Sequence, residues 1–459
     1  MSGGTLRADP LADATIARIL GPCMAADTSP QLASIAIVNR EIAAWDNNGK
    51  LATWRASPGV PAPIADALHD FVAAASILPD WADAALVERA EHVFMDIGMM
   101  SCTLLFCASL PECYVVPDLA AVLHAAGQLD NHCEYRIRAT AAMIFPVMMR
   151  GGLMTAAGAG VAQTMKVRLI HATIRYLILH GAVDADPAAI PAPVTGRPLP
   201  PAPDGAQPNM QQQLLANGWR PARDGLPCNQ DELAYTLLTF SYVYLRGLRK
   251  LGLALPPGDE LAFLHAWNVV GHLLGIERDL MPASMNQAAA MFGRLQAQGR
   301  NHPYTPDPRP ALADALMRTM QNDIPFRLLK PFPVLFTRHL CGSASATDLG
   351  LTSPVSWISG ALFAILMGTV RLVDATVRLV LPQFSFSRLL ARVVGYRFTV
   401  RILMDQTRPL KLPDALLGQV DGVLSGWTTD PKAPTWMNRL ERRIARPTRP
   451  PDQPLGGAA

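Results

Sequence analysis

One stretch decides the fold: residues 161–180 read VAQTMKVRLIHATIRYLILH. Four of its polar residues are spaced four, three and four positions apart, namely Thr164, Arg168, His171 and Arg175. At about 100° per residue these side chains fall within roughly 60° of one another, and apolar residues cover most of the remaining surface. A helix that is apolar nearly all round is buried, so we expect a core helix whose polar stripe faces a group that satisfies it.

The centre of this stripe has the chemistry of a metal ligand. His171 has a guanidinium group one turn away on each side, at Arg168 and at Arg175. A neutral imidazole is a good iron ligand, and the two arginines can pair with the carboxylates of an anionic cofactor. The alternative is a core histidine that is satisfied within the protein. We predict an anionic cofactor with a metal at its centre, ligated by His171.

A second polar pair lies upstream, in a helix that we predict over residues 131–150. Arg136 and Thr140 are four residues apart and therefore share a helical face. Above an iron site, a guanidinium and a hydroxyl can hydrogen-bond dioxygen and stabilise developing negative charge. From spacing alone, an ordinary amphipathic helix with exposed arginines is the alternative.

Composition limits the class of protein. The chain has 459 residues, of which 50% are hydrophobic and 17% charged, enough for a large buried core. The net charge of +3 gives no basic surface for nucleic acid, so we expect no nucleic-acid partner. The seven cysteines form no C-x-x-C pair, which argues against a zinc site and favours a reducing compartment. The first ten residues show no basic region followed by an apolar run, so we expect no export signal and a cytoplasmic location.

Apolar residues recur mostly at intervals of three and four, so we predict an all-α protein with one large helical domain. We expect an irregular N-terminal entry with short helices at 1–80, the helical domain at 81–410 and a C-terminal extension with a disordered tail at 411–459. Residues 187–208 hold eight prolines and read as a long loop inside the domain, with an interdomain linker as the alternative. Predicted helices include 88–110, 118–129, 230–251 and 257–274.

The region 355–401 suggests contact with a membrane surface. Residues 349–370 carry no charge, but Pro354 leaves only 16 residues before Arg371, short of the ~20 that span a bilayer. Six arginines then stand against one acid, Asp374: Arg371, Arg378, Arg388, Arg392, Arg397 and Arg401. This pattern is typical of a basic amphipathic segment on a membrane, so we predict peripheral contact with its inner face. The alternative is a buried helix pair whose arginines reach water.

Two motifs and three weaker segments carry a resemblance to a known family. The specific motif is KVRLIHAxxR at 166–175, and RxxxT at 136–140 precedes it by about 30 residues. The weaker segments follow in order: GLPCNQDEL at 225–233, TFS at 239–241 and WNVVGHLLGI at 267–276. Over roughly residues 88–282 the sequence resembles the rubber oxygenase (latex-clearing protein) and mpaB-type oxygenase family.

This resemblance implies a b-type haem, bound without covalent attachment, in an all-α fold with a globin-like three-over-three helical core plus extra helices. It also implies oxygen-dependent cleavage of carbon–carbon double bonds in polyisoprenoid chains. Carried over by position, it makes His171 the proximal iron ligand and places Arg136 and Thr140 on the distal side.

The sequence departs from the family pattern at two points. In latex-clearing proteins a lysine beside the distal threonine can cap the iron in a closed state, whereas Ala139 stands at that position here. The glutamate proposed as a base in those proteins has no fixed counterpart, and the nearby carboxyl groups are Asp118, Asp130 and Glu134.

We therefore predict a haem b-dependent oxygenase whose partners are dioxygen and an isoprenoid or another long apolar alkene. Without an export signal the protein would not meet polymeric rubber, so a small or membrane-dissolved isoprenoid is the expected substrate. Two alternatives stay open at this point. One is a non-catalytic haem-binding or gas-sensing protein, and the other is a membrane-surface α-helical protein without cofactor.

Overall fold

The computed structural model describes residues 3–21, 29–97, 99–125, 140–181, 214, 219, 221–301, 307–322, 324 and 326–380. Helices make up the regular structure of these residues, and no strand occurs among them. This confirms the predicted all-α class. The predicted proline-rich loop at 187–208 and the C-terminal extension at 411–459 lie outside the described residues.

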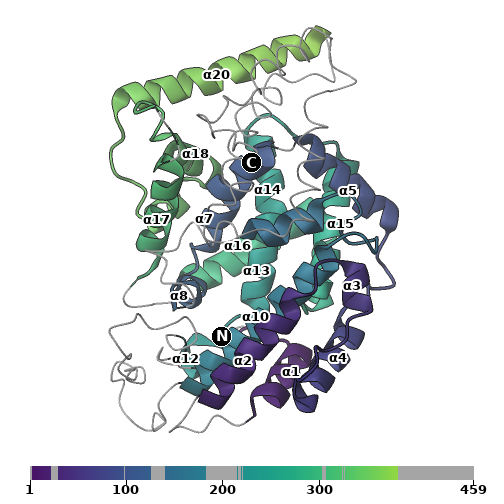
Figure 1. Cartoon of the computed structure of the whole chain (residues 1–459). Helices are drawn as coiled ribbons and strands as arrows, with labels where there is room; N and C mark the ends of the chain where they lie inside the picture. The colour runs from purple at the N-terminus through teal and green to yellow at the C-terminus, as the bar shows by residue number, and fades with distance from the viewer. Residues whose placement is uncertain are drawn as a thin grey trace, which may run out of the picture.

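The chain before residue 182 forms the first group of helices (Figure 1). Their bounds are α1 Pro10–Leu20, α2 Ser29–Ala43, α3 Asn48–Ala52, α4 Ala62–Ala75, α5 Ala84–Ile97, α6 Met99–Leu104, the π-helix η1 Leu105–Ser109, α7 Leu110–Cys113, α8 Pro117–Ala125 and α10 Gly160–Gly181. Residues 140–148 are also helical.

The second group follows from residue 221 onward. Its bounds are α12 Pro221–Asp224, α13 Gln230–Phe240, α14 Tyr242–Lys250, α15 Pro257–Leu273, the 3-10 turn η3 Arg278–Leu280, α16 Met285–Arg300, α17 Arg309–Asn322, α18 Phe332–Cys341, α19 Ser343–Asp348 and α20 Trp357–Val380.

The described part of 1–80 holds the helices α1 to α4, and short helices are what we expected in this N-terminal entry. Asp9 caps the start of α1 by accepting from the backbone N–H of Ala12, and Pro10 occupies the first turn, where its missing N–H costs nothing. At the other end, Gly21 adopts a φ of +63°, a conformation that favours glycine. The longer helices α2 and α4 also bury apolar faces, so this region adds to the core.

The helix α10 crosses the middle of the molecule and packs against α1, α3 and α15. In turn, α15 runs along α5, and α13 joins it at the centre of the core (Figure 1). Large side chains such as Trp267, Phe263 and Tyr235 are fully enclosed there. The polar stripe of α10 therefore lies against other helices, as its sequence predicts.

The predicted helix at 88–110 is broken in the structure. It ends at Ile97, and the chain continues at an angle of 91° through Met100–Cys113. Among the described residues no single helix has both the length and the apolar character needed to cross a bilayer; this bent pair alone meets the criteria, on length and composition only.

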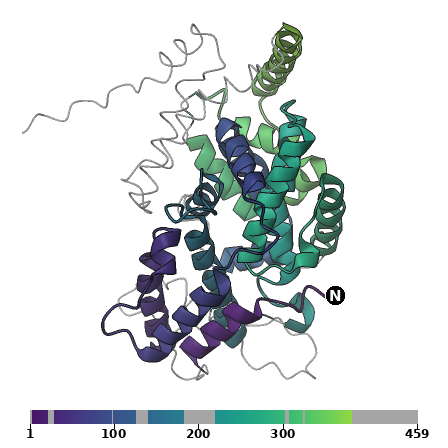
Figure 2. The same cartoon turned by 90° about the vertical axis from the view of Figure 1, so that its right-hand side faces the viewer.

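The last described helix, α20, stands apart from the rest of the molecule. Figures 1 and 2 both place it at one end, while α1 and α2 lie at the other. It touches the body through Phe363, whose ring meets Phe332 and Phe336 of α18 at centroid distances of 5.5 and 4.9 Å. The outer face of α20 carries exposed apolar side chains: Trp357, Ile358, Leu362 and Ile365.

Candidate functional site

The polar stripe of α10 is buried where its arginines lie. Arg168 and Arg175 are 8% and 3% exposed, and Thr164 is fully buried. The Thr164 hydroxyl donates to the carbonyl of Gly160, one turn earlier, at 2.7 Å. Two buried nitrogen atoms of the stripe have no hydrogen-bond partner among the described residues, Nδ1 of His171 and Nε of Arg175.

Both arginines donate to carboxylates of α1. The Arg168 guanidinium forms a bidentate pair with Asp9, with Nε–Oδ2 at 2.5 Å and Nη2–Oδ1 at 2.8 Å, and its Nη1 donates to the carbonyl of Leu273. Arg175 donates from Nη1 to Oδ1 of Asp13 at 2.9 Å. Asp9 is only 3% exposed, so these are charge-assisted bonds in a low-dielectric environment.

His171 has no such partner. Its Nδ1 atom is buried and makes no hydrogen bond to any described residue. Burial, with a smaller effect from the positive charge of Arg175, lowers the pKa of His171 to about 4, while Asp9 acts in the opposite direction. The imidazole is therefore neutral at physiological pH, the form that can bind a metal ion.

The apolar face beside His171 is incompletely covered. Val167 and Ile174, four residues before it and three after, are half-buried, and Ile170 is 40% exposed. Helical spacing puts these three side chains on one face, with His171 between that face and the arginine stripe. An imidazole with a free buried nitrogen, bordered by open aliphatic surface, suits a flat apolar cofactor with a metal at its centre.

The predicted distal residues are only partly visible. Thr140 begins the helical residues 140–148 and is half-buried. Arg136 and Ala139 lie outside the described residues, so their relation to His171 stays a prediction. Among the described residues no cluster of three or more His, Cys, Asp or Glu side chains is arranged to hold a metal ion.

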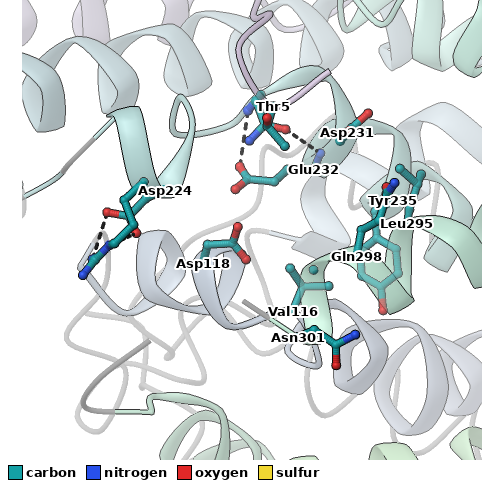
Figure 3. Close-up of a pocket in the computed structure, with 13 residues that line it drawn as sticks. Thr5, Val116, Asp118, Asp224, Asp231, Glu232, Tyr235, Leu295, Gln298 and Asn301 are labelled. Carbon is teal, nitrogen blue, oxygen red and sulfur yellow. Dashed lines mark hydrogen bonds and ion pairs between the residues drawn. The ribbon is translucent and has the colours of Figure 1, made fainter. Parts of the chain in front are cut away.

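A second feature is a cavity of about 500 Å³ between α8, α13 and α16 (Figure 3). Three buried carboxyl groups line it: Glu232 from α13, Asp118 from α8 and Asp224 from α12, which pairs with Arg223. Oε2 of Glu232 accepts from the backbone N–H of Asn229, while Oε1 has no hydrogen-bond partner among the described residues. Burial, and then the negative charge of Asp118, raise the pKa of Glu232 well above its usual value. Glu232 therefore tends to keep its proton.

A tight turn connects this cavity to α10. The carbonyl of Cys228 accepts from Nη2 of Arg175 at 2.9 Å, and the next residue, Asn229, starts the capping box with Glu232. Cys228 has a φ of +51°, which is uncommon for a residue with a side chain. The turn thus lies between Arg175 of the stripe and Glu232 of the cavity.

Sequence reasoning missed three of the residues described above. Glu232 carries a recognisable signal, because Asn229-x-x-Glu232 is a capping-box pattern before an apolar run. Asp9 before Pro10 is likewise a helix-start signal. Asp13 has no signal of its own. No sequence pattern pairs Asp9 or Asp13 with arginines about 160 positions later.

The fold and the stripe helix define an all-α protein with a buried histidine helix, and comparison with known proteins identifies its family. The family described as "ER-bound oxygenase mpaB/B'/Rubber oxygenase, catalytic domain" matches residues 92–372, more than half of the chain. The chain therefore belongs to this family. The predicted resemblance is confirmed, and so is the oxygenase class.

Two relatives illustrate how close the likeness is. The chain is 23% identical over 306 residues to the rubber oxygenase of Streptomyces sp. (strain K30), an alignment covering 66% of this chain and 65% of that protein, just under two thirds. The structure of latex clearing protein LCP in the closed state superposes with a TM-score of 0.58 at 18% identity, covering 93% of this chain and 91% of that one. This second likeness shows the shared fold.

Proposed function

We propose that this protein is a haem b-dependent oxygenase that cleaves carbon–carbon double bonds of an isoprenoid or another long apolar alkene. The observation that carries the proposal is His171, whose buried Nδ1 lacks a partner among the described residues at the centre of the family's most specific motif. Its lowered pKa keeps the ring neutral and ready to ligate iron.

The surroundings of His171 support a haem rather than a bare metal ion. Val167, Ile170 and Ile174 offer an apolar, partly open face on one side of the imidazole. A porphyrin buries most of its area against such side chains, and the hydrophobic effect favours that contact. When bound, the haem would supply the binding and activation of dioxygen, and the protein would supply orientation and a dry environment.

The other predicted site residues keep roles in this proposal. We assign Arg136 and Thr140 to hydrogen-bonding of dioxygen on the distal side, by position in the family motif. We assign Arg168 and Arg175 to cofactor binding, because they place positive charge next to His171. Because both guanidinium groups already bind α1 carboxylates, a haem propionate would have to share or displace Asp9 or Asp13.

The substrate is proposed to come from a membrane, with the protein bound at its cytoplasmic face. The first turns of α20 expose Trp357 by 79% and Ile365 by 65%, and this apolar face points away from α18. Arg371 and Arg378 follow on the same helix. Exposed apolar and aromatic side chains, followed in the sequence by arginines, suit the boundary between acyl chains and anionic headgroups.

The test is a visible spectrum of the purified protein, followed by substrate assays. We expect a Soret band that is lost or shifted in His171→Ala and unchanged in His180→Ala, a matched control on the exposed end of the same helix. Incubation with squalene or geranylgeraniol should consume dioxygen and give carbonyl products by mass analysis. A Soret band without oxygen uptake would instead indicate a haem-binding or gas-sensing protein. A band that His171→Ala leaves unchanged would refute the ligand assignment.

A further inference from the structure

Two acids of α1 reach both arginines that flank His171. Asp9 and Asp13 are four residues apart on α1 and meet Arg168 and Arg175, seven residues apart on α10. One helical turn separates the two acids, and two turns separate the two arginines. The two ion pairs therefore lie one after the other along the contact between α1 and α10. Helix α1 lies outside the residues that match the family, 92–372.

Burial makes these pairs strongly directional. The side chains of Asp9, Arg168 and Arg175 are 4%, 9% and 4% exposed, and that of Asp13 is 34% exposed. A buried charge without its partner is costly, so each guanidinium has one favourable position, against α1. Rotation of α10 about its axis would withdraw both arginines from their carboxylates at once.

Further bonds fix the segment at both ends. The Tyr176 hydroxyl of α10 donates to the carbonyl of Gly21, just after α1, at 2.6 Å. Before α1, the carbonyl of Ala8 accepts from Nε2 of Gln230, and that of Thr5 accepts from the N–H of Leu226. The N-terminal segment is therefore bonded to α10 at one end and to Leu226 and Gln230, before and at the start of α13, at the other, which opposes its following a rotation of α10.

His171 lies between the arginine stripe and the open apolar face of Val167 and Ile174. We infer that Asp9 and Asp13 are positioning residues, which hold the arginine side of α10 against α1 and so direct His171 toward the apolar face where a haem would bind. The inference rests on the proposed function, and it assigns to the N-terminal helix a role in cofactor retention.

The experiment measures how fast haem leaves the full-length protein, by transfer to excess apomyoglobin. Asp9→Asn is the main variant, because asparagine remains a good helix cap while the charge is lost. Ile16→Ala, a buried apolar change on the same helix, loosens α1 without touching a charge. Asp70→Asn removes an exposed acid that pairs with Arg18 of α1 and serves as the surface control.

Ile16→Ala shows how much a given loss of thermal stability speeds haem loss by itself. We expect Asp9→Asn to lose haem about tenfold faster, or more, than its own loss of stability would cause on that scale. Its Soret band should also shift. Asp13→Asn should have a smaller effect, because Asp13 is more exposed, and Asp70→Asn should have none. In the apoprotein, amide hydrogen exchange around His171 should rise in Asp9→Asn more than in Ile16→Ala.

Three outcomes separate this inference from the function that it builds on. Equal haem loss in Asp9→Asn and Ile16→Ala at equal stability overturns the positioning role alone. Slower haem loss in Asp9→Asn also overturns it, since the freed Arg168 would then be binding a haem propionate. A wild-type protein that takes up no haem overturns the proposed function, and the positioning role with it.

Discussion

Two buried charge clusters lie on either side of the turn at Cys228 and Asn229, and they are built in opposite ways. Against α1, each arginine of α10 meets a carboxylate, and the paired groups satisfy one another. In the cavity, Glu232 faces another acid, Asp118, and holds its proton because a second negative charge there is costly.

The difference teaches which side of the site is fixed and which side responds to its surroundings. Opposite charges in a buried contact define one geometry, as at Asp9 and Arg168, whereas burial raises the pKa of the more exposed Asp13 despite the charge of Arg175. Two like groups facing a cavity change their total charge as protons are gained or lost. The contact between Asp9 and Arg168 is therefore the fixed support of α10, while Glu232 in the cavity, and Asp13 beside Arg175, are the acids whose pKa is raised.

The largest expected effect comes from breaking the paired cluster. Arg168→Gln leaves the Asp9 carboxylate buried without its cation, which should lower the free energy of unfolding by about 3–5 kcal/mol. The double variant Asp9→Asn/Arg168→Gln removes both charges and should recover much of that loss. Urea denaturation of all four proteins of this cycle measures the coupling. Simple additivity of the two single changes would contradict a paired, buried charge.

The like-charge cluster should show the opposite sign. The pKa of Glu232 is raised in the folded state, so the folded protein holds this proton more tightly than the unfolded chain does. The group therefore costs stability as the pH rises from its unfolded pKa, near 4.5, through its folded pKa. Glu232→Gln should stabilise the protein at pH 8 relative to wild type and have little such effect at pH 4. A uniform loss at both pH values would contradict the protonated state of Glu232.

A third buried acid, Glu91, extends this comparison, because burial is the first cause of its raised pKa and the like charge of Glu88 contributes less. Glu91 is 2% exposed, its Oε2 accepts from the N–H of Gly151, and burial raises its pKa to about 7. Its cost to stability should develop between pH 4.5 and 7 and reach at most roughly 3 kcal/mol. Glu91→Gln keeps an acceptor for Gly151 and should flatten the pH dependence of thermal unfolding in this window. A slope equal to wild type would show that another group titrates there.

The smallest effect is expected at the surface. Arg18 of α1 pairs with Asp70 at 2.7 Å, but the two side chains are 48% and 65% exposed. Because water and salt screen such a pair, Asp70→Asn should change the free energy of unfolding by at most about 1 kcal/mol. Denaturation in low and high salt measures this. A loss as large as that in Arg168→Gln would mean that burial does not distinguish the two ion pairs of α1.

The sequence predicted those parts of the fold that depend on local periodicity. The helix predicted at 257–274 appears as Pro257–Leu273, because its apolar residues and its proline start are local signals. The helix predicted at 230–251 is interrupted at Ser241, whose hydroxyl donates to the carbonyl of Leu237 and whose backbone leaves regular helix geometry. Such a break arises because the serine hydroxyl competes for the hydrogen bonds of the helix backbone. The spacing of apolar residues does not reveal this competition.

The candidate site was predictable only in part, for a related reason. The His171 stripe is contained within one helix, so its spacing alone revealed a core helix with a polar edge. The partners of that stripe are 159 and 162 positions away, at Asp9 and Asp13, and Asp118 is also remote from Glu232 in sequence. Contacts of this kind arise from tertiary packing, and a single sequence carries no pattern for them.

The most direct test of the central claim, that His171 is the iron ligand of a bound haem, is cavity rescue. The His171→Gly variant is purified after expression with added haem precursor, and its visible spectrum is recorded before and after addition of imidazole. The account predicts that the Soret band of the wild type is lost or shifted in the variant and returns when imidazole fills the space of the missing ring. A wild-type spectrum in His171→Gly without imidazole would contradict it.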